Sequence, residues 1–508
     1  MEEFIVEPEK NIPVLRDVDI LVIGGSQSGV AAAVSAKRAH PESSVLLVEQ
    51  NGYLGGQAVG GLVIHWEFRE LTNNKGQVLA RGIAKELIRR VVEKGHSDPL
   101  YTEYLEGRGP PFKNEEDGRG HGDIPLNIND IKLALIEICE EAGIEVLLHT
   151  RVAGALPLDT SSTFPASRGA FVETINGRYA IKAKMVVDCS ANADMAWYIG
   201  GDEAVIVPET QVMTMQAYVW IENVDLEKFV KEGMWKGSAF QVLYPKDKKQ
   251  MLAHVHQGKT IIVRGFADVI DEAYEAHPEL LDEYEEIGAI PQIYFWLKTV
   301  KTNKIQCNGK TKYFGTFAIE GPQFRWKQID PFLVSKAEMN QVKGAHIQAA
   351  MHKYLPGWEN SRLARTVDRI GFRQTRIPKG IYALTAEDVH KHAIFEDVVG
   401  RASGHDIGRG NPEAEYGYDI PYRMLVPAKI DGLLFGARAL SVEGDTSDQN
   451  LTALNAHRGI TACMIASQAS GVAAALCVRE GCEPRDLDIN TLQKALRAQD
   501  VVLTTPKE

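Results

Sequence analysis

Hydrophobic and polar positions near the start of the chain follow the order strand, helix, strand. Residues 17–23 (DVDILVI) are too apolar for an exposed strand and predict a strand buried on both faces of a parallel sheet. A glycine-rich turn follows at Gly24–Gly29, then a small-residue helix at 30–36 and a second apolar strand at 45–48. The pattern predicts a βαβ unit in which the glycine turn opens the helix.

This unit has the features of a site for the ADP half of a dinucleotide. Gly24 and Gly29 allow a tight turn and close helix packing, so that the helix N-terminus presents free N–H groups to a pyrophosphate. Glu49, at the tip of the second strand, is placed to accept hydrogen bonds from ribose hydroxyls. Ser26 departs from the usual G-x-G-x-x-G pattern, although its hydroxyl can itself bond a phosphate oxygen. The motif alone leaves NAD and FAD open.

The same α/β pattern continues to about residue 205. It predicts helices at 80–95 (ending at Gly95) and from Asn127 or Asn129 to Ala142, a long loop at 98–125, and strands at 144–149 and 185–188. After residue 205 the pattern changes to strand-like runs, such as 211–221 and 260–266, separated by acidic and aromatic stretches. This change indicates an inserted lobe.

The C-terminal region returns to the pattern of the first domain, with a predicted strand at 432–438 and an Ala-rich helix at 461–476. We therefore predict an α/β fold with a discontinuous Rossmann-like FAD-binding domain and an inserted α+β substrate lobe. The expected boundaries are 1–205 and 418–508 for the FAD-binding domain (with an excursion at 60–125) and 206–417 for the lobe, including a helical region at 336–372. A discontinuous nucleotide domain favours FAD over NAD.

Composition narrows the class of protein further. The 508 residues carry a formal net charge of −12, which argues against nucleic acid or an anionic membrane surface as the main partner. No run of eighteen apolar residues predicts a membrane span. The acidic N-terminus does not resemble a signal peptide, so a cytoplasmic location is expected.

A metal site is not expected. The six cysteines form no C-x-x-C pair, and His254 and His256, which we expect on one face of a strand, have no evident third ligand.

Seven motifs, in order along the chain, resemble those of the FAD-dependent oxidoreductases of the glutathione-reductase-like superfamily. That family is distantly similar to the fumarate reductase and succinate dehydrogenase flavoproteins. The resemblance covers about residues 15–478. Its motifs are Gly24–Gly29, Gly52–Gly56, Val187–Ser190, Gly371–Arg376 with Leu384–Asp388, Pro421–Pro427, Gly436–Arg438 and Arg458–Gly471.

The resemblance implies a set of FAD contacts. Gly55 and Gly56 match the double glycine beside the pyrophosphate and flavin, and Val152 matches the position whose backbone meets the adenine. Arg458 matches the arginine that opens the final helix, whose N-terminus would face the flavin N1–C2=O edge. The complete expected set is Gly24, Gly25, Ser26, Ser28, Gly29, Glu49, Gln50, Gly55, Gly56, Gln57, Val152, Ser190, Gly436, Arg438 and Arg458.

Four residues are candidates for the chemistry. His65 follows the double-glycine turn and is a candidate base or substrate contact; its structural alternative is a hydrogen bond beside Trp66. Arg373 and Arg376 match paired arginines that bind a carboxylate or carbonyl, with an ion pair to Asp368 or Asp388 as the alternative. His457 precedes the final helix; its alternative roles are helix capping or an interdomain hydrogen bond.

The predicted function is oxidation of a small polar molecule (an alcohol, an amine or a hydroxy acid) by hydride transfer to flavin N5. Electrons would leave to oxygen, a quinone-like acceptor or a protein. Reduction of an activated C=C bond is the alternative with the same cofactor, and flavin monooxygenation is a weaker one. A non-catalytic FAD-binding subunit and an NAD-only dehydrogenase are the alternatives from other classes. The sequence leaves homo-oligomerisation open.

Overall fold

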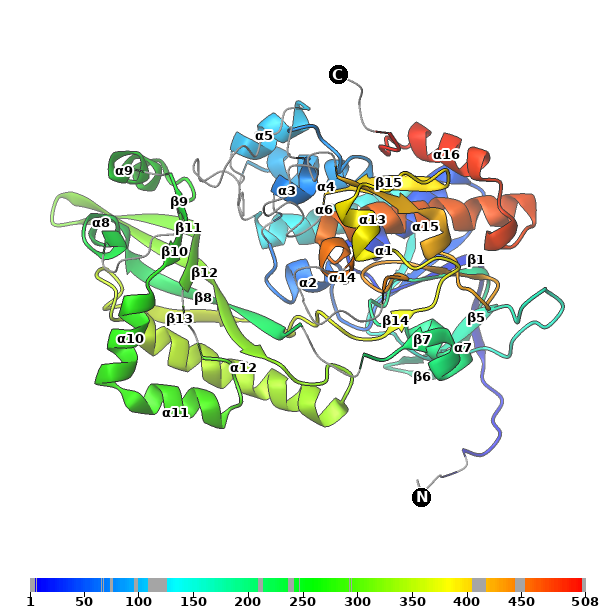
Figure 1. Cartoon of the computed structure of the whole chain (residues 1–508), viewed down its shortest axis with the longest axis horizontal. Helices are drawn as coiled ribbons and strands as arrows, with labels where there is room; N and C mark the ends of the chain where they lie inside the picture. Colours follow the sequence, from blue (N-terminus) through cyan, green and yellow to red (C-terminus); the bar gives the residue numbers. More distant parts are fainter. Residues whose placement is uncertain are drawn as a thin grey trace.

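A computed structural model of the chain describes residue 5 and residues 7–64, 66, 68–73, 76–95, 99–107, 126–208, 213–235, 242–245, 247–291, 293, 295–403, 417–443 and 453–504. Two lobes lie side by side in Figure 1, one containing the N-terminal and C-terminal parts of the chain and the other containing the middle.

The helices lie at α1 Gln27–Ala39, α2 Gly56–Val59, α3 Phe68–Leu71, α4 Ile83–Glu93, α5 Pro99–Leu105, α6 Ile128–Ala142, α7 Asp194–Ala204, α8 Leu226–Lys231, α9 Lys248–Gln257, α10 Ala267–Ala276, α11 Pro278–Glu286, α12 Pro331–His352, α13 Ala386–His390, α14 Ala453–His457, α15 Ile460–Glu480 and α16 Ile489–Ala498. Asn127 caps α6 by accepting from the N–H groups of Asn129 and Asp130. Of the loop expected at 98–125, residues 99–105 form α5, and 108–125 lie outside the described residues.

The first lobe is built on a parallel sheet. β1 (Val14–Ile23) pairs with β2 (Val45–Val48) on one side and with β6 (Gly177–Asp188) on the other. β3 (Glu145–Leu147) extends the sheet beyond β2, and β17 (Leu433–Phe435) pairs in parallel with the second half of β6. Because β17 comes from the far end of the chain, the predicted discontinuous α/β fold is confirmed.

The first half of β6 continues into an antiparallel meander with β5 (Gly169–Thr174) and β4 (Arg151–Ala155). β6 therefore changes partner along the same edge, from β5 to β17. This change brings the ends of β1, β6 and β17 together at the carboxyl edge of the parallel strands, where ligands bind in open α/β sheets.

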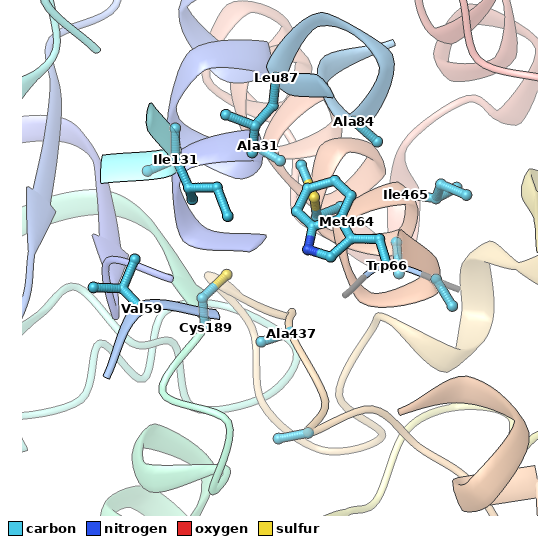
Figure 2. Close-up of a cluster of buried hydrophobic side chains, with 14 of the residues drawn as sticks. Ala31, Val59, Trp66, Ala84, Leu87, Ile131, Cys189, Ala437, Met464 and Ile465 are labelled. Carbon is cyan, nitrogen blue, oxygen red and sulfur yellow. The ribbon is translucent and has the colours of Figure 1, made fainter. Parts of the chain in front are cut away.

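Helices α1 and α15 pack closely because small residues face each other. A Cβ on Gly471 would lie 2.0 Å from the carbonyl oxygen of Ala32, so only glycine fits there. Figure 2 shows the buried cluster between these helices and the nucleotide turn, with Trp66, Met464 and Ala437 in it. By length and composition α15 is apolar enough to cross a membrane, but 94% of its most apolar window is buried, as in a core helix.

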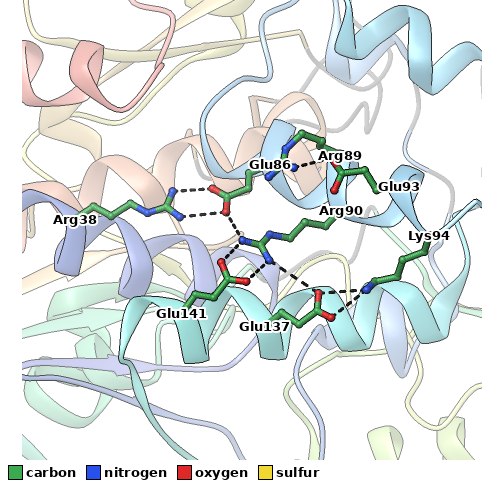
Figure 3. A network of polar contacts seen from close by, with 8 residues as sticks. All are labelled: Arg38, Glu86, Arg89, Arg90, Glu93, Lys94, Glu137 and Glu141. Atoms are coloured by element: carbon green, nitrogen blue, oxygen red, sulfur yellow. Dashed lines mark hydrogen bonds and ion pairs between the residues drawn. The ribbon is translucent and has the colours of Figure 1, made fainter.

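An ion-pair network joins α1, α4 and α6 on the outside of this lobe (Figure 3). Glu86 of α4 accepts from Arg38 of α1 at 2.7 Å and from Arg90 at 3.0 Å. Arg90 also pairs with Glu141 of α6 at 2.5 Å, and Lys94 with Glu137 at 3.0 Å. The network fixes the helices that cover one side of the sheet.

The middle lobe is an antiparallel sheet in the order β13–β8–β12–β11–β10–β9. Its strands are β8 Met215–Asp225, β9 Val242–Tyr244, β10 Ile262–Gly265, β11 Phe295–Cys307, β12 Lys310–Phe324 and β13 Arg362–Thr366. One face is apolar, with Val219, Leu297 and Ile319 fully buried. His352 of α12 stacks on Phe295 of this face, so α12 covers it.

Two short pairs of strands complete the fold. β7 (Val205–Ile206) pairs with β14 (Ile377–Pro378), and β15 (Val398–Ala402) pairs with β16 (Tyr418–Pro421). β15 also packs against α15 and α16 of the first lobe. The proposed lobe boundary at 417/418 therefore divides the β15–β16 pair.

Two expectations about local structure are wrong. The helical region expected at 336–372 ends at His352, because Pro356 and Gly357 (φ +92°) break the helix and residues 362–366 form β13. His254 and His256 lie on helix α9 and not on a strand. His254 Nδ1 lies 2.9 Å from the carbonyl oxygen of Thr260, and His256 Nε2 lies 2.8 Å from Glu227.

Candidate functional site

A cavity of about 1140 Å³ is lined by both lobes. Its walls include the nucleotide-type turn at Gly24 and Ser26, the start of α15 at Ile460, and the lobe sheet at Gln216 and Trp296. Sites for small ligands usually measure about 300–1,000 Å³. The volume therefore suits a dinucleotide with room for a second molecule.

The glycines of the first turn are required by close backbone packing. Gly24 has φ +96°, and a Cβ there would lie 2.4 Å from the carbonyl oxygen of Cys189 at the end of β6. A Cβ on Gly29 would lie 1.7 Å from the carbonyl oxygen of Gly24. The turn can therefore hold the N-terminus of α1 at the cavity only with glycine at both positions.

Ser26, the departure from the usual glycine pattern, is the N-cap of α1. Its hydroxyl accepts a hydrogen bond from the N–H of Gly29 at 3.5 Å. The side chain also lies against the double-glycine turn, since a Cβ on Gly56 would sit 2.8 Å from the Cβ of Ser26. Gly56 has φ +44° and lines the same cavity. The serine is therefore accommodated by the glycine facing it.

Glu49, at the end of β2, is buried beside the same turn. Its Oε2 accepts from the N–H of Gly25 at 2.6 Å, and its Oε1 accepts from the N–H of Asn51 at 2.8 Å. The carboxylate lines the cavity. It is thus fixed in position with acceptor capacity left for ribose hydroxyls.

Asp188, at the end of β6, organises the loop on the opposite side of the turn. It accepts from the N–H groups of Ser190 at 3.0 Å and Met195 at 2.9 Å. Burial, with Asp194 nearby, raises the pKa of Asp188 to about 6. Ser190 in turn accepts from the N–H of Asp194 at 3.2 Å and lines the cavity.

The segment after β17 is a second place where the backbone packs closely beside the cavity. A Cβ on Gly436 would lie 2.5 Å from Cys189 Sγ, and the N–H of Ala437 donates to Ser467 Oγ at 2.7 Å. Arg438 lines the cavity and donates to the carbonyl oxygen of Ala191 at 2.7 Å. Burial lowers the pKa of Arg438 to about 10, which leaves the guanidinium charged at neutral pH.

The start of α15 carries both a cation and an anion. Arg458 donates from Nε to Asn455 Oδ1 at 2.8 Å. A Cβ on Gly459 would lie 2.7 Å from Glu70 Oε1, so this carboxylate stands at the positive end of the helix. Arg458, Gly459 and Glu70 all line the cavity.

Most of the expected cofactor contacts meet at this cavity. Its walls include Gly24, Ser26, Ser28, Glu49, Gln50, Gly56, Gln57, Val152, Ser190, Arg438 and Arg458. Gly25, Gly29, Gly55 and Gly436 lie behind the wall, where their missing side chains permit the close packing. Gln27, which lines the cavity with only 4% of its surface exposed, has no hydrogen-bond partner at Nε2. This buried donor and the glycine cradle fit FAD.

The four candidates for chemistry have different surroundings. Arg373 lines the cavity and donates to Thr214 Oγ1 at 3.3 Å. Arg376 also lines it but forms an ion pair with Asp194 at 3.0 Å, a different partner from the Asp368 or Asp388 considered from the sequence. His65 lies outside the described residues.

His457 is buried behind the cavity, and its Nδ1 lies 2.7 Å from the hydroxyl of Tyr418. Burial lowers the pKa of His457 to about 4, so the ring is neutral at physiological pH. Tyr418 lies on β16, in the same predicted C-terminal part of the chain (418–508) as His457, so this is not the interdomain hydrogen bond considered from the sequence.

Sequence reasoning missed the polar face of the lobe sheet. Gln216, Tyr218, Arg264, Trp296, Lys298 and Glu320 all line the cavity from this sheet. Gln216 and Tyr218 alternate along β8 and Trp296 and Lys298 along β11, while Arg264 comes from β10 and Glu320 from β12, all opposite the apolar face. The alternation was visible in the sequence, but the pairing of distant strands that brings these side chains together was not.

Comparison with known proteins identifies the family of the chain. No curated protein matches the sequence. Among solved structures, a geranylgeranyl bacteriochlorophyll reductase-like protein from Thermoplasma acidophilum shares 11% identity over 95% of this chain and 83% of its own, with a TM-score of 0.40.

A myxobacterial chondrochloren halogenase shares 12% identity over 95% of this chain and 79% of its own, with a TM-score of 0.41. At these TM-scores the likenesses carry no argument about chemistry. The sequence model of the family described as FAD dependent oxidoreductase, however, matches residues 19–496. The chain therefore belongs to the FAD-dependent oxidoreductase family.

Proposed function

We propose that this enzyme oxidises a small polar molecule (an alcohol, an amine or a hydroxy acid) by hydride transfer to FAD. The observation that carries the proposal is a single cavity lined both by the nucleotide-type groups at Gly24 and Glu49 and by the polar face of the lobe sheet. A substrate held on that face can meet the flavin without leaving the cavity.

When bound, FAD supplies the acceptor for the hydride. The residues of the chain bind and orient the substrate and receive its proton. Arg373 is proposed to hold a carboxylate or carbonyl, since it lines the cavity and Thr214 steadies its guanidinium. Glu338 is a proposed proton acceptor, because its carboxylate lines the cavity and burial raises the pKa of this carboxyl above its usual value.

The electrons would then leave to oxygen, a quinone-like acceptor or another protein. Reduction of an activated C=C bond is the alternative in which electrons flow from the reduced flavin to the substrate, so the direction of electron flow needs a direct test. Purified enzyme is mixed without oxygen with a panel of alcohols, amines and hydroxy acids while the visible flavin absorbance is followed. Bleaching by a panel member supports the proposal. Reoxidation of prereduced enzyme by an enoate, with no bleaching by the panel, would refute the proposal in favour of C=C reduction.

A further inference from the structure

We propose that an apolar wall of the cavity, next to Arg373, is a substrate subsite, and that the alcohol, amine or hydroxy acid oxidised here carries an apolar chain or ring. The apolar wall consists of six residues that line the cavity: Ile290, Pro291, Ile293, Ile329, Pro331 and Val334. The inference rests on the proposed function, which it sharpens by naming the substrate class. It is carried by the hydrogen bonds that join this wall to Arg373 and by the apolar surface that the wall exposes inside the cavity.

Trp326 holds the two parts of the apolar wall together. The chain turns at Gly288 after α11, and a Cβ on Gly288 would lie 2.4 Å from Cζ2 of the Trp326 indole. Lys336 Nζ of α12 lies 5.1 Å from the centroid of the same indole. The tryptophan therefore contacts both the segment that leads to Ile290 and the helix that begins at Pro331.

Hydrogen bonds join the first part of the wall to the Arg373 side chain. The N–H of Ile290 donates to the carbonyl oxygen of Gln323 at 2.8 Å. The Oε1 of the same glutamine accepts from Thr214 Oγ1 at 3.0 Å, and Thr214 Oγ1 accepts from the Arg373 guanidinium at 3.3 Å. One glutamine and one hydroxyl thus connect Ile290 to the cation.

The second part of the wall is joined to the backbone of the same arginine. Gln328 is 4% exposed, and its Oε1 accepts from the N–H groups of Arg373 at 2.7 Å and Gln374 at 2.9 Å. Ile329 follows Gln328 directly, and Asp330 then caps α12. Both parts of the apolar wall therefore adjoin Arg373, so a ligand group that this guanidinium holds has apolar side chains beside it.

The wall exposes apolar surface inside the cavity. Ile290 is 37% exposed and Ile293 is 73% exposed, and both line the cavity. Ligand cavities bury most of the surface of their ligand against apolar side chains, and each methylene group removed from water favours binding. An apolar chain or ring of the substrate is the occupant that fits, because it enters the cavity together with the group that Arg373 holds.

The proposed proton acceptor stands at the edge of the same wall. Val334 and Glu338 are four residues apart on α12, so their side chains are neighbours on one side of the helix, and both line the cavity. The Glu338 carboxylate accepts from the N–H of Ile370 at 3.0 Å, which fixes its position. A substrate whose polar group lies between Arg373 and Glu338 would extend its apolar part along the wall.

The test uses FAD-loaded enzyme and two ligand series of increasing length. One series contains lactate, 2-hydroxybutyrate and 2-hydroxyhexanoate, and the other contains ethanol, butanol and hexanol. Binding is measured by equilibrium dialysis and by the perturbation of the flavin spectrum. In at least one series we expect the affinity to rise about threefold for each added methylene group, so that the longest member binds at least about tenfold more tightly than the shortest.

Variants at the exposed part of the wall test its role. The double variant Ile290→Ser and Ile293→Ser should remove most of the gain in affinity with length. Arg373→Met should weaken the binding of every hydroxy acid and keep the gain per methylene group. Ile305→Ser is the matched control, because Ile305 is 48% exposed on β11 and is not among the described residues that line the cavity; its gain should equal that of the wild type.

FAD content and melting temperature are checked for each variant, so that loss of folding is not counted as loss of binding. Three results would overturn the subsite: no rise in affinity with length in either series, a double variant that retains the gain, or an equal loss in Ile305→Ser. A second copy of the protein is the rival occupant of the wall. A dimer that the double variant dissociates, with affinities that do not depend on length, would assign the wall to that interface and also overturn the subsite.

Failure of the proposed function is a separate result. Binding that strengthens with length, without bleaching of the flavin by any member of either series, would support the subsite and refute hydride transfer. Bleaching by short and long members that bind equally well would support hydride transfer and refute the subsite.

Discussion

The Cβ of Ser26 lies 2.8 Å from the place that a Cβ on Gly56 would occupy. These two residues come from different glycine motifs, one before α1 and one at the start of α2. The side chain at position 26 therefore makes glycine necessary at position 56. The effect of having Ser26 where the usual pattern has glycine is thus confined to this pair of residues.

This contact predicts non-additive mutations. Gly56→Ala adds strain from its φ of +44° and an overlap with Ser26, so we expect about 2–3 kcal/mol of lost stability and weaker FAD binding. In a Ser26→Gly background the 2.8 Å contact is gone and only the Cα of residue 26, at 3.3 Å, remains close, so the same substitution should cost about 1 kcal/mol less. Thermal unfolding and FAD titration of the four proteins measure this coupling.

Gly143→Ala controls for backbone strain alone. Gly143 has φ +68° with no atom within 4 Å of an added Cβ, so its cost should be about 1 kcal/mol in either background. If Gly56→Ala lost the same stability with serine and with glycine at position 26, the predicted contact between positions 26 and 56 would be refuted.

A buried ion pair ties the β15–β16 hairpin together. Arg401 and Asp419 form an ion pair with side-chain exposures of 7% and 2%. Burial raises the pKa of Asp419 despite the opposing effect of Arg401. Arg401→Met leaves an uncompensated buried carboxylate, and we expect a loss of about 3–5 kcal/mol.

The exposed pair of Arg362 and Glu222, at 2.8 Å, is the control for that variant. Arg362 is 75% exposed and Glu222 is 36% exposed, so Arg362→Met should cost at most about 1 kcal/mol. Chemical denaturation followed by fluorescence compares the two variants. Similar losses of stability in the two variants would show that the burial of Asp419 does not determine the cost of removing its partner.

The nucleotide half of the site was predictable because its signals are local. The apolar run ending at Ile23, the glycines at 24 and 29 and the acid at Glu49 lie within one βαβ unit, and chain order alone places them at one sheet edge. The return strand β17 was found the same way, as an apolar segment between glycines.

The lobe half depends on register and could not be predicted in that way. Trp296 and Arg264 meet because β10 and β11 pair antiparallel, and a shift of one residue would turn each side chain to the opposite face. The ion pair of Arg376 with Asp194 also joins segments far apart in the chain. Sequence reasoning looked for its partner among nearby acids.

Two buried histidines predict how stability depends on pH. Burial lowers the pKa of His352 to about 3 and that of His457 to about 4, from 6.5 in the unfolded chain. Below pH 6.5 the unfolded chain takes up protons that the folded protein does not, so stability is lost as pH falls towards 4. Each histidine contributes a slope of up to about 1.4 kcal/mol per pH unit.

Asp188 opposes this loss, because its raised pKa of about 6 lets the folded protein bind a proton before the unfolded chain does. His352→Phe keeps the stack on Phe295 and removes one titration, so its stability should fall less steeply between pH 6.5 and 4. Melting temperatures across this range measure the difference. A His352→Phe slope equal to wild type would refute the prediction.

Glu70 predicts a change in flavin potential. Its carboxylate stands at the first turn of α15, and its Oε2 lies 3.5 Å from the hydroxyl of Thr461. The positive helix end would stabilise the reduced anionic flavin, and Glu70 opposes that effect. Glu70→Gln should therefore raise the two-electron potential by about 10–40 mV, the equivalent of roughly 0.5–2 kcal/mol.

Spectroelectrochemical titration of the purified enzyme measures this shift. Glu338→Gln is the comparison, because Glu338 lines the same cavity but accepts from the N–H of Ile370 at 3.0 Å and is not at a helix start. We expect a smaller shift there. An unchanged or lower potential in Glu70→Gln would show that the flavin does not face the N-terminus of α15, since a carboxylate at that helix end could not then act on the reduced ring.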